Sequence, residues 1–131
     1  MNHVLAVDDS HVIRRLVEVS LDPLDILVET AGTGGDACER LLASRPDLLL
    51  LDLGLPDMPG WQVLEYARSE PALDGLPVIL LTGYDDADDR NRADDHLVEA
   101  YLVKPFRPAD LRRAVVEVLQ AEDQTTRNLP R

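Results

Sequence analysis

The stretch Leu48-Leu49-Leu50-Leu51-Asp52-Leu53-Gly54-Leu55-Pro56 decides the fold of this chain. Its four consecutive leucines are too short a run for a helix and leave no polar face. This pattern is typical of a strand that is buried on both faces, as strands are in a parallel sheet. We therefore expect Asp52 to stand at the carboxyl end of a central strand, where the chain leaves the sheet.

Other short runs before and after this one predict four more strands, at Val4–Val7, Asp25–Val28, Val78–Leu81 and Ala100–Val103. Between them, apolar residues recur at helical spacing within 13–21, 37–42, 63–67 and 111–119. The segment 85–96 is a weaker helix candidate, because only Ala87 and Ala93 interrupt its polar run. The alternation predicts an α/β fold, a flavodoxin-like doubly wound sheet of five parallel strands in the order 2-1-3-4-5 with helices on both faces.

The composition is that of one globular domain without a membrane segment. The 131 residues are 45% hydrophobic and 29% charged, and no apolar run approaches the roughly 20 residues of a membrane helix. The formal net charge of −12 argues against direct nucleic acid binding, which needs clustered Lys and Arg. The single cysteine, Cys38, fits a reducing cytoplasm. We expect one domain over residues 1–120 and a loose polar tail over 121–131.

Three acidic side chains follow strands that should be neighbours. Asp8 and Asp9 follow the first strand and Asp52 the third, and ligands of such sheets bind where the strand order reverses. Carboxylates this close repel each other by ~1 kcal/mol per pair in water and ~4 kcal/mol at an effective dielectric constant of 20. Mg²⁺ would relieve that repulsion, since it binds one or two carboxylates and keeps several waters. Thr82 and Lys104 end the fourth and fifth strands, and their side chains suit phosphoryl oxygens at the same edge.

Together these residues resemble a known family. The set Asp8-Asp9, Asp52, Thr82 and Lys104-Pro105-Phe106 is similar to the receiver domain of bacterial two-component response regulators, in particular stand-alone regulators of the chemotaxis kind. The resemblance covers about residues 3–120, and the loop 52–60 has its proline and glycine where the family has them. Each piece alone is a weak motif, but the whole set in order and on the expected strands is specific.

The resemblance implies a phosphorylation-activated signalling switch and not an enzyme with turnover. Asp52 would accept a phosphoryl group from a sensor histidine kinase or a phosphotransfer protein. Asp9 and Asp52 would ligate Mg²⁺, or Mn²⁺ in its place, the carbonyl of Gly54 would complete the protein ligands, and Asp8 would act through water. The domain would then assist its own metal-dependent phosphorylation and dephosphorylation.

The resemblance also implies how the phosphoryl group is sensed. Lys104 would pair with the phosphoryl oxygens, Thr82 would hydrogen-bond one of them, and Tyr101 would turn inward in response. The Lys104–Pro105 peptide is expected to be cis, a state that normally occurs only before proline. The helix at 85–96, the fifth strand and the last helix would form the face that binds a downstream protein.

The sequence departs from the family pattern at three points. The stretch 96–99 lacks the glycine that family members often have before the fifth strand. The helix at 85–96 is unusually acidic, with six aspartates and two arginines between Asp85 and Asp95. Gly54 and Tyr84 occupy the two positions that in the family tune how water reaches the phosphoryl group. A bulky Tyr84 is expected to slow hydrolysis.

Two other classes of protein fit the sequence less well. A phosphatase of the haloacid-dehalogenase kind places its nucleophile after the first strand in an Asp-x-Asp pattern, whereas this chain has Asp8-Asp9-Ser10 and no room for a cap domain. A nucleotide- or flavin-binding module of the same fold would have a glycine-rich loop after the first strand. Here Gly32, Gly34 and Gly35 follow the second strand instead.

Overall fold

A single parallel sheet forms the centre of the molecule. The computed structural model describes residues 1–83 and 98–128. The strands are β1 (Asn2–Val7), β2 (Ile26–Ala31), β3 (Leu48–Asp52), β4 (Val78–Thr82) and β5 (Ala100–Val103). They pair in parallel in the order β2-β1-β3-β4-β5, so the predicted topology is confirmed.

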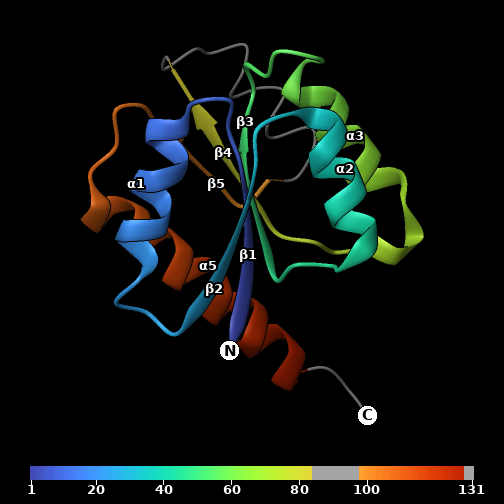
Figure 1. Ribbon diagram of the computed structural model, residues 1–131. Helices are drawn as coiled ribbons and strands as arrows, with labels where there is room; N and C mark the ends of the chain where they lie inside the picture. The colour runs from blue at the N-terminus through green and yellow to red at the C-terminus, as the bar shows by residue number, and fades with distance from the viewer. Residues whose placement is uncertain (84–97, 129–131) are drawn as a thin grey trace.

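Helices cover both faces of the sheet. They are α1 (His11–Leu21), α2 (Gly34–Ala43), α3 (Gly60–Ser69) and α5 (Pro108–Asn128), with a 3₁₀ turn, η1 (Pro71–Leu73), before β4. In Figure 1, α1 and α5 lie on one face and α2 and α3 on the other. The predicted helix at 85–96 lies outside the described residues.

The leucines of β3 supply the middle of both cores. Leu48 and Leu50 pack in the cluster under α1 and α5, and Leu49 and Leu51 pack in the cluster under α2 and α3. All four are fully buried. Because successive side chains of a strand point to opposite faces, a strand covered on both sides needs an apolar residue at every position. Leu48–Leu51 therefore lies where neither face of the sheet is exposed to solvent.

The second strand and one helix position differ from the sequence prediction. Strand β2 runs three residues beyond Val28, because Glu29 and Thr30, which end the apolar run, still pair with β1. At the edge of the sheet such polar side chains reach solvent, which explains why the apolar pattern stopped short of the strand end. Leu42, the last residue of the apolar pattern within 37–42, is 54% exposed and does not join the core. Leu41 already fills the inward position, and the next residue points about 100° around the helix.

The last helix is longer than the sequence predicted. Residues from 121 onward were expected to form a loose tail, but α5 continues to Asn128. Ala121, Glu122 and Gln124 in this segment are good helix formers, so its polar composition does not end the helix. The domain boundary near residue 120 stays a prediction. No helix among the described residues combines the length and apolar character that crossing a membrane requires.

Candidate functional site

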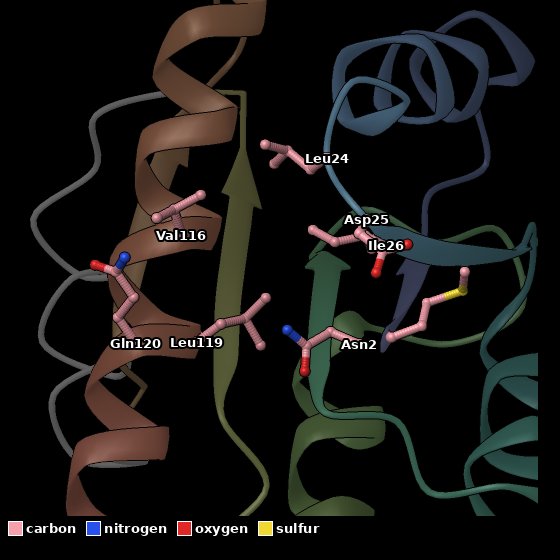
Figure 2. A pocket seen from close by; sticks show the side chains of 8 residues that line it. Asn2, Leu24, Asp25, Ile26, Val116, Leu119 and Gln120 are labelled. Atoms are coloured by element: carbon pink, nitrogen blue, oxygen red, sulfur yellow. The ribbon is translucent and has the colours of Figure 1, made fainter.

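Hollows lie at both ends of the sheet. The hollow in Figure 2, of about 470 Å³, lies at the amino end and has a mixed lining. Its lining includes apolar Leu24, Ile26, Val116 and Leu119 and polar Asn2, Asp25 and Gln120. The other, of about 440 Å³, lies at the carboxyl end of β3, β4 and β5. It is lined by Asp52, Leu53, Gly54, Trp61, Thr82, Gly83 and Lys104. Of these two hollows, the second contains Asp52, Thr82 and Lys104, which the sequence predicted for phosphoryl chemistry.

Three carboxylates gather beside this hollow, as the topology predicted. Asp8, Asp9 and Asp52 each offer an oxygen, and these oxygens lie within 4.8 Å of one another. Asp8 and Asp52 are buried, whereas Asp9 is exposed. A donor set made of carboxylate oxygens alone suits a hard divalent cation and not a soft one. The arrangement could therefore hold a metal ion.

Lys104 bridges two of the three carboxylates. Its Nζ lies 2.5 Å from Oδ2 of Asp8 and 3.2 Å from Oδ1 of Asp52. Burial opposes the charge of the ammonium, but the hydrogen bond and charge of Asp8, together with the charge of Asp52, outweigh it and raise the pKa of Lys104. Burial also raises the pKa of Asp8, against the hydrogen bonds from Lys104 and Ser10, which lower it. One ammonium cannot neutralise three carboxylates, so the site keeps a net attraction for cations.

The turn after β1 holds Asp8 through contacts that the sequence prediction missed. Oδ1 of Asp8 accepts a hydrogen bond from the amide of Ser10 at 2.9 Å. The backbone carbonyl of Asp8 accepts one from the guanidinium of Arg14 at 2.7 Å. The hydroxyl of Ser10 accepts from the amide of Ile13 and so caps α1. A serine directly before an apolar-periodic segment is a sequence signature of a helix start, and could have identified this cap.

The turn after β3 holds Asp52 through backbone contacts. Oδ1 of Asp52 accepts a hydrogen bond from the amide of Gly54 at 3.2 Å. The amide of Gly60, at the start of α3, donates to the carbonyl of Leu53 at 2.9 Å and closes the loop. A Cβ on Gly60 would lie 2.4 Å from the carbonyl oxygen of Asp52, whereas a Cβ on Gly54 would meet nothing within 4 Å. Close approach thus requires glycine at 60 and leaves open space at 54.

The ends of β4 and β5 place the remaining predicted residues. The amide of Lys104 donates to the carbonyl of Thr82 at 2.6 Å, which brings both residues to the hollow. The Lys104–Pro105 peptide is cis, the geometry that the resemblance implies. Tyr101 is half-buried against the core cluster under α2 and α3. Tyr84 lies outside the described residues.

Comparisons with known proteins identify the family. The family model described as the response regulator receiver domain matches residues 4–116. Regulatory protein LuxO of Vibrio cholerae is 39% identical over 83% of this chain and 24% of its own length. The probable transcriptional regulator ycf27 of Porphyra purpurea is 33% identical over 96% of this chain and 51% of its own length. The chain therefore spans about half or less of the length of these relatives.

Solved structures give the same result. Chemotaxis protein CheY4 of Vibrio cholerae is 30% identical, with a TM-score of 0.85 over 90% of this chain and 98% of that one. The signal receiver domain of a putative LuxO repressor protein from Vibrio parahaemolyticus is 26% identical, with a TM-score of 0.91 over 99% of this chain and 98% of that one. With the strand order and the family match over most of its length, the chain belongs to the receiver domains of response regulators.

Proposed function

We propose that this chain is a phosphorylation-activated signalling switch whose phospho-acceptor is Asp52. The observation that supports this most is the position of the Asp52 carboxylate, which lines the hollow at the carboxyl end of the sheet beside Lys104 and Thr82. The donor is a phosphohistidine of a sensor histidine kinase or a phosphotransfer protein, as expected for a response regulator receiver. Each chain accepts one phosphoryl group on Asp52 and then assists the hydrolysis of that group.

The transfer step needs one free carboxylate oxygen. Among the described residues, both contacts of Asp52, from the amide of Gly54 and from Lys104, fall on Oδ1. Oδ2 is then the oxygen that attacks phosphorus. The new O–P bond forms as the P–N bond to the donor histidine breaks, and the electron pair of that bond stays on the imidazole nitrogen. Such transfers depend on in-line positioning and charge neutralisation more than on covalent assistance.

The acidic cluster would hold the metal that this chemistry uses. Bound Mg²⁺, or Mn²⁺ in its place, supplies positive charge to the phosphoryl oxygens. Asp9, Asp52 and the carbonyl of Gly54 would be its protein ligands, with Asp8 acting through water. The carboxylate oxygens within 4.8 Å of one another support this assignment.

The response would begin at Thr82 and Lys104. Lys104 would leave Asp8 and form an ion pair with the phosphoryl oxygens. The hydroxyl of Thr82 would donate a hydrogen bond to one of these oxygens. The backbone bond between these residues would carry the movement into β5, where Tyr101 would turn further inward. The downstream protein would bind the face of residues 85–96, β5 and α5. With a formal net charge of −12, the chain favours a basic protein partner over nucleic acid.

Acetyl phosphate tests the proposed function against the hydrolase alternative. Incubation with acetyl phosphate and Mg²⁺ is expected to add one phosphoryl group per chain, seen as an acid-stable and base-labile mass increase. Omission of Mg²⁺ is expected to prevent it. Release of many phosphates per chain without a stable adduct would contradict a receiver and indicate a phosphatase.

Lys104→Ala is expected to lower the melting temperature of the metal-free protein and slow its labelling by acetyl phosphate. The variant leaves the buried Asp8 and Asp52 without their ammonium, and breaking a buried ion pair costs about 3 kcal/mol. Mg²⁺ should therefore recover more stability in this variant than in the wild type. Arg107→Ala, which removes an exposed cation, is the matched control for charge. Equal melting temperatures for the two variants without Mg²⁺ would contradict the role of Lys104.

A further inference from the structure

The loop between β3 and α3 contacts the start of α2 through one carboxylate. Oδ1 of Asp57 accepts a hydrogen bond from the amide of Gly34 at 2.8 Å, and Oδ2 accepts one from Gly35 at 2.9 Å. These hydrogen bonds lower the pKa of Asp57, so the group is ionised at neutral pH. Amides in the first turn of a helix have no partner within the helix, which makes them available to a side chain from elsewhere.

The start of α2 has a second cap that is independent of the loop. The hydroxyl of Thr33 accepts a hydrogen bond from the amide of Asp36 at 3.1 Å, and the carbonyl of Thr33 accepts one from Ala37. This is the ordinary local cap of a helix. Helix α2 thus has one cap from the residue that precedes it and one from Asp57, more than 20 residues further along the chain. Only the cap from Asp57 also restrains the loop that follows Asp52.

Packing beside Asp57 strengthens this restraint. A Cβ on Gly34 would lie 2.4 Å from Cγ and 2.6 Å from Sδ of Met58, so the methionine side chain packs directly against the glycine. At the other side of the loop, the amide of Gly60 donates to the carbonyl of Leu53. The loop is therefore closed at its base by Leu53 and Gly60 and attached near its middle to α2. Gly54 lies between these two restraints.

We propose that Asp57 is a positioning residue for the metal site, because it anchors to α2 the loop that carries Gly54. This inference rests on the proposed function, in which the carbonyl of Gly54 is a metal ligand. The amide of the same residue donates to Oδ1 of Asp52, so a displaced loop would disturb a second ligand as well. A ligand that must be ordered when the ion arrives binds more weakly than one held in place beforehand.

The pair Asp57→Ala and Thr33→Ala separates positioning from simple helix capping. Each variant removes one cap of α2, so both are expected to lower the melting temperature of the metal-free protein. Only Asp57→Ala should raise the dissociation constant for Mg²⁺, measured by isothermal titration calorimetry, by about tenfold, as is typical when a group that orients a metal ligand is lost. Asp57→Asn keeps one acceptor oxygen without the charge, and should fall between Asp57→Ala and the wild type.

Amide exchange provides a measurement without metal. In Asp57→Ala the amide of Gly60, which closes the loop, is expected to exchange faster than in the wild type and in Thr33→Ala. Equal Mg²⁺ affinities for Asp57→Ala and Thr33→Ala would overturn the inference and leave the proposed function standing. If Asp57→Ala does not fold, an Asp57→Asn variant with wild-type affinity overturns it equally. A wild-type chain that binds no Mg²⁺ would overturn the proposed function, and this inference with it.

Discussion

Asp52→Asn is expected to melt at a higher temperature than the wild type when no metal is present. The three carboxylate oxygens of Asp8, Asp9 and Asp52 lie within 4.8 Å, and Lys104 contacts Asp8 and Asp52. Removing the charge of Asp52 removes two repulsions and one attraction, while Lys104 keeps Asp8 as its partner. The lower bound for each of these terms, which is its magnitude in water, is about 1 kcal/mol. The net gain of about 1 kcal/mol corresponds to roughly 4 °C for a domain of this size.

The same variant should lose its response to Mg²⁺. At a hundredfold excess over the dissociation constant, Mg²⁺ should stabilise the wild type by ~2.7 kcal/mol, and a site with one carboxylate fewer should gain far less. Thermal unfolding of both proteins with and without Mg²⁺ measures this. Asp74→Asn is the matched control, because it removes one exposed charge near η1, away from the site. A wild-type melting temperature that does not change when Mg²⁺ is added would contradict the metal site.

Gly60→Ala is expected to destabilise the protein about as strongly as the loss of Lys104. The added Cβ would lie 2.4 Å from the carbonyl oxygen of Asp52 and 2.6 Å from Cα of Leu53, and both neighbours are backbone atoms. Backbone atoms cannot relieve the clash by a change of rotamer as a side chain can. Either α3 or the turn after β3 must therefore move. Overpacking of this kind costs about 3 kcal/mol. The melting temperature should fall by roughly 10 °C.

Gly54→Ala is the matched control in the same loop. A Cβ at this position meets nothing within 4 Å, so the change in the free energy of unfolding should stay within about 0.5 kcal/mol. Thermal unfolding followed by circular dichroism compares the two variants directly. Equal melting temperatures for the two glycine variants would contradict a role in stability for the close contact between α3 and the turn after β3.

The fold could be predicted from the sequence because its strands have simple patterns. Leu48–Leu51 lies in the most enclosed strand, where every position must be apolar, and the observed β3 has the predicted start. Prediction was weakest where a segment has a solvent face. Glu29 and Thr30 lie in an edge strand, and the helical residues after Ala121 are polar, so the sequence has no periodic apolar pattern at either place.

The candidate site could be predicted for a topological reason. Parallel strands have their carboxyl ends at one edge, so Asp8, Asp52, Thr82 and Lys104 had to come together once the strand order was known. The attachment of Asp57 to α2 could not be predicted in this way. It joins a side chain to backbone amides more than 20 residues away. Nearly every residue has a backbone amide, so the sequence does not indicate which amides a distant side chain will contact. Nor could the sequence identify the proposed phosphoryl donor, because its recognition depends on the surface of a second protein.

The most direct test of the central claim is the location of the phosphoryl group on the chain. After labelling with acetyl phosphate and Mg²⁺, reduction with borohydride converts an aspartyl phosphate into homoserine, which peptide mass spectrometry can place at a single residue. We predict homoserine at position 52, with none at Asp8 or Asp9, and no conversion in Asp52→Asn. Homoserine at another aspartate in the wild type, or labelling of Asp52→Asn to the wild-type extent, would contradict the assignment of Asp52 as the phospho-acceptor.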